Sequence, residues 1–387
     1  MNLKLIERLN KKIDQIIPGI VTFRQQMHSD PEIGLETYRT KARIRQELAN
    51  TAVSELPSYL GADFVGELKG KGDGLICLRA DTDGLPITET TGLPYSSKTS
   101  GLMHACGHDG HTAILIGVAL VLDYFKEYLC PTVRFIFQPG EEVVCGGKKL
   151  VASGGVAGVQ ACYALHGWPG LPVGVISTRP GVLFAAGATF TIELLGQAAH
   201  GAMPEQGNNP IPVVGVVLDH LGKMSEKEKK ANGSIISVCS VNAGQSATII
   251  PAKAVIKGTA RYLEPDKGRW IEEEIKQIVA DASNKHKIQA KVFFDHGYAK
   301  PVKNSEAGFQ RVATLVQSYL PAGVWRVAQE PTMVCEDFAY YLNSNDGCMF
   351  FLGLGEDSPK LHSGDFDFND TALKNGILTM SLLALSY

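Results

Sequence analysis

Residues 75–83 read Leu-Ile-Cys-Leu-Arg-Ala-Asp-Thr-Asp. The first six residues form a mostly apolar run, which is typical of a buried strand, and the last three are polar. Two later runs have the same form, since residues 133–137 lead into the polar segment 138–142 and residues 161–165 lead into 166–168. Helical patterns separate these runs. The alternation predicts an α/β domain with a mostly parallel sheet and helices on both faces, and with ligands bound at the carboxyl ends of its strands.

The pattern changes between residues 183 and 295, where strand, helix, two strands, helix and strand are expected in that order. These segments are 189–195, 210–221, 234–241, 252–262, 266–286 and 290–294. They predict a small α+β domain inserted into the larger one, which would comprise residues 1–182 and 296–387. A chain of 387 residues is long for one hydrophobic core, which also favours two domains.

Composition and charge argue against several kinds of partner. The net charge is -3, and the lysines and arginines are scattered among acidic residues, so we expect no nucleic-acid partner. Residues 1–20 have the spacing of an amphipathic helix rather than of a secretory signal, and no window is long and apolar enough to span a bilayer. We therefore expect no membrane partner and a cytoplasmic location.

The eight cysteines lie far apart and include no CxxC pair. Seven of them are expected to be small buried hydrophobic residues. Cys106 differs, because it stands in a glycine-rich polar loop among histidines.

The densest chemical signal is His104-Ala105-Cys106-Gly107-His108-Asp109-Gly110-His111, which precedes an apolar helix. Thiolate and imidazole ligands favour zinc, manganese or nickel over calcium. The glycines allow a tight turn, so that alternate side chains can reach one point. The alternative is structural, because histidines near a helix start can also cap it or form hydrogen bonds.

Glu141 and Glu142 follow a predicted strand, and Pro139-Gly140 directs them to the carboxyl edge of the sheet. Adjacent carboxylates usually mark a solvated turn, but here one can bind metal while its neighbour accepts a proton from water. His166 and His362 are isolated histidines, which are more often structural. With Cys106, His108 and Glu142 they complete a five-ligand set, the size needed for two metal ions that hydrolyse amides or esters.

Several segments, taken in order, resemble the motifs of the M20 metallopeptidase family. They are 103–112, 138–142, 165–167, 198–204, 258–261, 336–341 and 362–370, and the similarity begins at 24–36. The match is to the amidohydrolase branch, which includes hippurate hydrolases, N-acyl amino acid amidohydrolases, N-acetyldiaminopimelate deacetylases and indoleacetyl-amino acid hydrolases. The resemblance implies a zinc-exopeptidase-like catalytic domain with an inserted lid and dimerisation domain.

The resemblance also implies a role for individual residues. The ligands of two divalent metal ions fall at Cys106, His108, Glu142, His166 and His362. Glu141 matches the general base, and Asp81 and Asp83 match a polar strand end that supports the metal site. His104, Asp109 and His111 match positions not usually counted as ligands.

In the inserted domain, His200 matches a histidine that reaches the active site of a partner subunit and stabilises an oxyanion, which implies a homodimer or a higher oligomer. Arg261 matches a residue that contacts the substrate carboxylate, although a strand-edge salt bridge is the structural alternative. Thr248 stands where relatives commonly carry asparagine facing the active site. Val143-Val144 and Cys335 also replace smaller residues, so the substrate is not fixed by the motifs.

We therefore expect hydrolysis of small N-acyl amino acids, of the hippurate or N-acetyl type, by a metal-activated water with Glu141 as the base. One alternative keeps the site but makes the chain a dipeptidase or aminopeptidase. Another is a catalytically inactive, metal-binding dimeric module. The presence of Glu141 beside a full ligand set argues against that last possibility.

Overall fold

The computed structural model describes residues 3–387 and divides into two compact units. The first comprises the chain up to residue 183 together with 303–330 and 337–387, and the second comprises 184–302 and 331–336. The second unit extends beyond the expected residue 295 because its last long strand, β12 (Gln289–Tyr298), stays paired with β7 (Gly181–Leu195) as far as Tyr298. It also includes β15 (Thr332–Cys335), which pairs with the start of β7.

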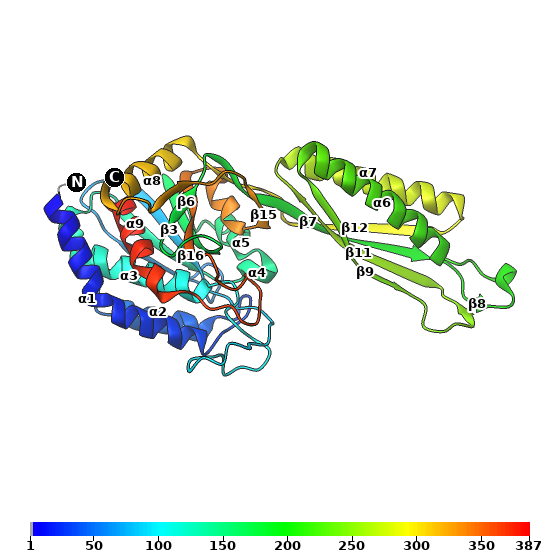
Figure 1. Cartoon of the computed structure of the whole chain (residues 1–387), viewed down its shortest axis with the longest axis horizontal. Helices are drawn as coiled ribbons and strands as arrows, with labels where there is room; N and C mark the ends of the chain where they lie inside the picture. The colour runs from blue at the N-terminus through cyan, green and yellow to red at the C-terminus, as the bar shows by residue number, and fades with distance from the viewer. Residues whose placement is uncertain (1–2) are drawn as a thin grey trace. The chain divides into compact units, whose positions relative to one another are not determined.

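An eight-stranded sheet forms the centre of the first unit (Figure 1). Its order is β1-β2-β4-β3-β5-β16-β6-β14. The strands are β1 (Ser54–Glu55), β2 (Phe64–Leu68), β3 (Leu75–Asp81), β4 (Thr132–Gln138), β5 (Ala161–Pro169), β6 (Ile176–Thr178), β14 (Trp325–Val327) and β16 (Asp346–Gly355). The central strands β4, β3, β5 and β16 are parallel. Strand β2 is antiparallel to β1 and β4, and β6 is antiparallel to β16 but parallel to β14. The sheet is thus mixed and mostly parallel, as predicted.

Helices cover both faces of this sheet. They are α1 (Leu3–His28), α2 (Tyr38–Leu48), α3 (His108–Tyr124), α4 (Glu141–Val144), α5 (Gly146–Ala152), α8 (Glu306–Tyr319) and α9 (Leu373–Leu385), with short 3-10 turns η1 (Lys126–Tyr128), η3 (Asp337–Asn343) and η4 (Asp370–Ala372). Alternation along β3 separates the faces: Leu78 belongs to the core that includes α1, α3 and α9, while Arg79 bonds to Asp337 in η3.

The second unit is an α+β layer with its own core. Its sheet has the order β12-β7-β11-β9, with β13 (Val302–Asn304) and β15 also paired to β7. The remaining elements are β8 (Ala199–His200), η2 (Pro204–Gln206), α6 (Ile211–Asn232), β9 (Ile235–Ala243), β10 (Ile249–Ile250), β11 (Lys253–Tyr262) and α7 (Pro265–Lys285). Helices α6 and α7 lie together along the sheet (Figure 1). Apolar residues of both helices, such as Val217 and Ile275, pack against Ile192 and Ile256 of the strands.

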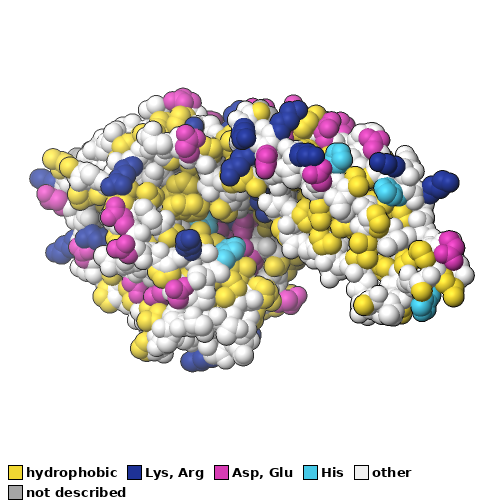
Figure 2. All heavy atoms as spheres, turned by 45° about the vertical axis from the view of Figure 1, so that its right-hand side comes forward, with side chains coloured by type: hydrophobic (Ala, Val, Ile, Leu, Met, Phe, Trp, Pro, Cys, Tyr) yellow, Lys and Arg dark blue, Asp and Glu magenta, His cyan; other side chains and the backbone are white. Residues whose placement is uncertain are grey.

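Surface features agree only in part with the expectations. Cys130 and Cys239 are exposed and Cys335 is half-buried, so the prediction of seven buried cysteines was wrong for these three. Cys239 lies in the edge strand β9, at a register shift where it has no paired residue in β11. Positive and negative side chains are interspersed among the described residues on the face in Figure 2. Within residues 3–387, no helix is long and apolar enough to cross a membrane.

Candidate metal centre

Four of the expected ligands lie where the central strands end and α3 begins. Cys106 precedes α3, whose first residue is His108, and Gly107 between them has a φ of 82°. This left-handed conformation favours glycine, and it lets the chain turn sharply between the two ligand residues. Glu142 lies in α4, which starts three residues after the end of β4, and His166 lies in β5.

His362 reaches the same place from the connection between β16 and η4. Its N–H donates a hydrogen bond of 2.8 Å to the carbonyl oxygen of Ala105, next to Cys106. The φ of His362 is 63°, a conformation that non-glycine residues rarely adopt and that costs about 1 kcal/mol or more. Its side chain is 49% exposed, in contrast to the buried side chain of His108, so His362 marks the accessible side of the centre.

The donor atoms of these five side chains form overlapping sets whose members lie within 4.8 Å of one another. One set contains Cys106, His108 and His166, and another contains Cys106, Glu142 and His362. Cys106 belongs to both, so the structure brings all five residues together around its thiol. Glu141 lies in a further set with His108 and Glu142.

The spacing of the donor atoms suits bound cations. Two ligands that are each about 2.0–2.3 Å from a tetrahedral metal ion lie roughly 3.3–3.8 Å apart. Cys106 Sγ is 3.5 Å from His166 Nε2, and His362 Nε2 is 3.3 Å from Glu142 Oε1. His108 Nε2 and Glu142 Oε1 are 3.9 Å apart, and neither buried atom has a hydrogen-bond partner among residues 3–387. A cation would satisfy both atoms.

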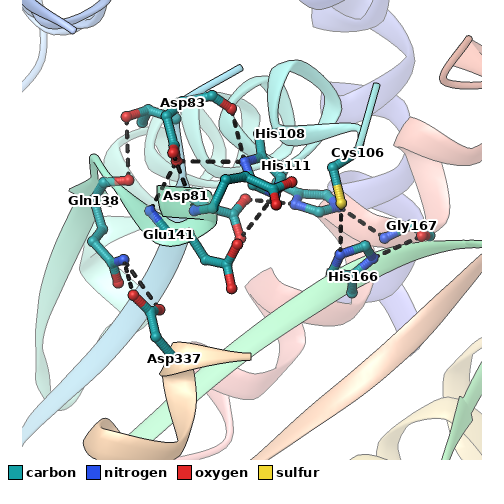
Figure 3. Close-up of polar contacts among 12 residues, drawn as sticks. Asp81, Asp83, Cys106, His108, His111, Gln138, Glu141, His166, Gly167 and Asp337 are labelled. Carbon is teal, nitrogen blue, oxygen red and sulfur yellow. Dashed lines mark hydrogen bonds and ion pairs between the residues drawn. The ribbon is translucent and has the colours of Figure 1, made fainter. Parts of the chain in front are cut away.

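Asp83 orients the ligands without belonging to these sets (Figure 3). Its carbonyl oxygen accepts a hydrogen bond of 2.9 Å from His108 Nδ1, so that Nε2 is left to face the other donors. Its carboxylate accepts bonds from the backbone N–H groups of Glu141, at 3.0 Å, and Glu142, at 3.2 Å. Asp83 therefore fixes a histidine and both glutamates.

Both ring nitrogens of His111 form hydrogen bonds with other protein groups. Its Nδ1 bonds to Asp81 Oδ1 at 2.6 Å, and its Nε2 accepts a bond of 2.8 Å from the N–H of Gly167 (Figure 3). Both nitrogens are thus occupied, although Asp81, His108 and His111 also lie close enough to form a ligand set. Next to it, His166 Nδ1 donates to the carbonyl oxygen of Gly167 at 2.8 Å, which directs Nε2 toward Cys106.

The centre has a large excess of buried acidic groups. Burial raises the pKa of the Cys106 thiol well above its usual range, and the nearby Glu142 and Glu141 carboxylates add to the effect. Burial alone would lower the pKa of His108, but Asp81, Asp83 and Glu142 outweigh it and raise the pKa to about 10. The pocket therefore favours positive charge, which divalent cations would supply while stabilising the thiolate.

The residues expected to meet substrate lie in the second unit. His200 in β8 pairs with Ile249 in β10, and its exposed side chain accepts a bond of 3.1 Å from the N–H of Ala202 at Nδ1. Thr248 lies beside it, because the N–H of Gly201 donates to the carbonyl oxygen of Thr248 at 2.7 Å.

Arg261 lies in β11, where its guanidinium bonds to the hydroxyl of Thr259 and, at 3.2 Å, to the carbonyl oxygen of Ala260. Within the described residues 3–387 it forms no ion pair with a carboxylate. The structural alternative for Arg261, a strand-edge salt bridge, is therefore not present in this part of the chain.

The model of a known protein family, described as Peptidase family M20/M25/M40, matches residues 77–386. The chain belongs to this family. The N-acetylcysteine deacetylase of Bacillus subtilis (strain 168) is 33% identical to it over 358 residues, which cover 92% of this chain and 93% of that protein. The N-acetyldiaminopimelate deacetylase of Lacticaseibacillus casei (strain BL23) is 31% identical over 368 residues, with 92% and 95% covered.

A solved structure of a dinuclear metal-binding M20 peptidase from Bacillus subtilis is similar over both units. The TM-score is 0.83 and the identity 29%, with 96% of this chain and 98% of that chain covered. This M20 chain is accordingly a hydrolase, and its deacetylase relatives agree with the amidohydrolase branch that the motifs resemble.

A buried polar network next to the candidate metal centre was not predicted from the sequence. Arg79 bonds to Asp81 Oδ2 at 2.6 Å, to Asp337 Oδ1 at 2.7 Å and to Gln138 Oε1 at 3.0 Å. The Gln138 amide also donates to Asp337, and Tyr341 donates to Gln138 at 2.9 Å. The charged Arg79 within an apolar strand was the available signal, because a buried charge needs partners.

Proposed function

We propose that this M20 hydrolase cleaves the amide bond of small N-acyl amino acids, of the N-acetyl or hippurate type, with two divalent metal ions. The observation that carries the proposal is the convergence of the five ligand residues on Cys106, with Glu141 in the same pocket. Two relatives named as deacetylases of N-acetylcysteine and N-acetyldiaminopimelate support this substrate class. A thiolate, three imidazoles and a carboxylate suit zinc, manganese or nickel.

In the proposed reaction, two divalent cations would be held by Cys106, His108, Glu142, His166 and His362. When bound, they would acidify the attacking water and polarise the acyl carbonyl. Glu141 accepts the proton of that water and returns it to the departing amine, which is a poor leaving group without it. Asp83 keeps Glu141 in place through the backbone hydrogen bond at 3.0 Å.

The second unit would bind the rest of the substrate. Arg261 is proposed to bind the substrate carboxylate through its planar guanidinium, and its lack of a carboxylate partner within residues 3–387 supports this role. His200 is proposed to donate a hydrogen bond to the oxyanion in the active site of a second copy of the chain, so that the working enzyme is a homodimer. Thr248, beside His200, would contact the acyl group.

The first test compares the parent with Glu141→Gln on N-acetyl amino acids, hippurate and dipeptides. Loss of base and proton carrier together should lower kcat by at least about a thousandfold without loss of bound metal. Glu127→Gln, at an exposed glutamate, is the control and should keep full activity. Faster cleavage of dipeptides by the parent would favour a dipeptidase, and full activity of Glu141→Gln would refute the role of Glu141.

A mixing experiment tests the action of His200 across subunits. His200→Ala and Glu141→Gln chains should each be nearly inactive. After unfolding and refolding together, a mixed dimer contains one site with Glu141 from one chain and His200 from the other, so about a quarter of all sites should work. A mixture as inactive as its parts, or a fully active His200→Ala chain, would remove this part of the proposal.

A further inference from the structure

Arg24, near the C-terminal end of α1, is a fully buried cation with three carboxylate partners. Its Nε and Nη2 bind both oxygens of Asp370, at 2.8 and 3.0 Å. Its Nη1 binds Asp367 at 2.7 Å and Asp109 at 3.3 Å. The guanidinium also lies over the ring of Tyr95, at 4.7 Å from the centroid, and the Tyr95 hydroxyl donates to Asp367.

These carboxylates belong to two segments that are far apart in the sequence, and each segment carries one of the proposed ligands. Asp109 directly follows His108 in the first turn of α3. Asp367 and Asp370 follow His362 in the segment that leads into η4. Arg24 therefore links both ligand-bearing segments through one planar group.

A second residue of α1 strengthens the link. His28, one turn after Arg24, bonds through Nδ1 to Asp109 at 2.8 Å, and its Nε2 lies 3.3 Å from Glu89. The loop that carries Glu89 is bound in turn to the His362 segment, because the N–H of Thr90 donates to the carbonyl oxygen of Gly364 at 2.7 Å. The end of α1 thus holds both segments by two routes.

We infer that Arg24 is a positioning residue, which sets the spacing of His108 and His362 and thereby the affinity of the centre for metal. The inference rests on the proposed function, because it takes both histidines to be ligands. Without Arg24, three carboxylates would face one another with no cation among them, and the segments would separate. Their donor atoms both lie near Glu142, at 3.9 and 3.3 Å, so a small shift changes the space for an ion.

The geometry also explains why lysine cannot replace this arginine fully. The guanidinium binds Asp370 with two parallel bonds and directs further N–H groups to Asp367 and Asp109. An ammonium group is a point charge with donors in another arrangement. Arg24→Lys should therefore retain charge balance but relax the spacing.

The test measures Zn²⁺ affinity of the whole chain by competition with a chromogenic chelator, for Arg24→Met, Arg24→Lys and the parent. Loss of a residue that supports metal ligands typically weakens metal binding by roughly 10–100-fold, which we expect for Arg24→Met, with a smaller loss for Arg24→Lys. Arg134→Met is the matched control, since buried Arg134 binds Glu67 and the carbonyl oxygens of Gly155 and Ala157. It should bind Zn²⁺ within about twofold of the parent, because distant sites act independently.

Thermal unfolding of each variant shows whether a loss of Zn²⁺ affinity reflects only a lower stability of the fold. Unchanged Zn²⁺ affinity in Arg24→Met, or an equal loss in Arg134→Met, would overturn the positioning role. If Arg24→Met does not fold, Asp370→Asn tests the same link and should weaken binding by roughly tenfold, whereas unchanged affinity overturns the inference. If the Arg24 inference fails but the parent chain binds two Zn²⁺ ions, the proposed metal centre is still supported. If the parent chain does not bind Zn²⁺ tightly, the proposed function itself is refuted.

Discussion

Replacement of Arg79 by methionine should destabilise the first unit strongly, because this arginine balances two buried carboxylates. Its side chain and those of Asp81 and Asp337 are fully buried. Burial alone would raise the pKa of Asp81, but Arg79 and His108 outweigh it and hold the pKa well below its usual range. Methionine has a similar shape and leaves both carboxylates without this partner.

The magnitude can be obtained in two ways. Hydrogen bonds to charged groups contribute about 1.5–3 kcal/mol each, so the bonds of 2.6 Å to Asp81 and 2.7 Å to Asp337 together contribute about 3–6 kcal/mol. Removal of one partner of a buried ion pair costs about 3–5 kcal/mol in comparable proteins. These energies are not reduced for solvent screening, because the side chains of Arg79, Asp81 and Asp337 are fully buried. We therefore expect Arg79→Met to lower the free energy of unfolding by about 3–5 kcal/mol.

The assay is urea unfolding of metal-free protein, followed by tryptophan fluorescence and by circular dichroism. Trp168 and Trp325 lie in the first unit and Trp270 in the second, so Trp270→Phe removes the signal of the second unit. Arg79→Lys should lose less than Arg79→Met, since it keeps the charge. A loss under about 1 kcal/mol for Arg79→Met would mean that the network contributes little and would refute the reasoning.

Two further predictions concern metal and thiols. Removal of metal by a chelator should lower the melting temperature of the parent. The reason is that an ion present at a thousand times its Kd contributes about 4 kcal/mol of stability. Calorimetry measures the change, and an unchanged melting temperature would contradict a structural contribution of the metal. Native protein should react rapidly with a disulfide reagent at the exposed Cys130 and Cys239, whereas buried Cys106, whose pKa is raised, should react only after unfolding. Mass spectrometry of the labelled peptides checks this, and rapid labelling of Cys106 would show that the centre is open to solvent.

Strands with long apolar runs were predicted well from the sequence. The runs 75–80, 133–137 and 161–165 are β3, β4 and β5, and their parallel pairing is confirmed. The short strands β1, β6 and β14 were not predicted, because two or three residues carry no periodicity. Their pairing depends on neighbours that are distant in sequence.

The first helix shows a different limit. It was expected to end at Ile20, but α1 begins at the first described residue and continues to His28. Its last eight residues include buried Arg24 and His28, whose polarity interrupts the amphipathic pattern. Their burial depends on carboxylates from 61 to 346 positions away, and no local pattern contains that information.

The candidate site was also predicted only in part from the sequence. Residue type and order were enough to name five residues that lie together at Cys106, since side chains at the ends of neighbouring parallel strands converge, and their role as metal ligands stays a prediction. The supporting residues could be named only in part. Asp81 is the last residue of β3 and Asp83 lies two residues after it, whereas the hydrogen bond from Gly167 to His111 depends on the packing of α3 against β5. Spacing along the chain cannot specify such a contact.

In both supporting networks, a buried arginine binds a carboxylate that is linked to a histidine in or beside the candidate centre. Arg79 binds Asp81, which holds His111 against the backbone beside His166. Arg24 binds Asp109, whose backbone continues from His108.

The carboxylates of Glu142, Glu141 and Asp81 lie near the Cys106 thiol, and they would repel one another without positive charge nearby. Arg24 and Arg79 supply fixed positive charge beside the centre without occupying the space between the proposed ligand atoms. The ligands can then remain close together before metal binds, so that less of the binding free energy is spent on ordering them. On this argument, Arg24→Met and Arg79→Met should both weaken metal binding, and the double variant should lose close to the sum, because the two networks approach the centre through different residues.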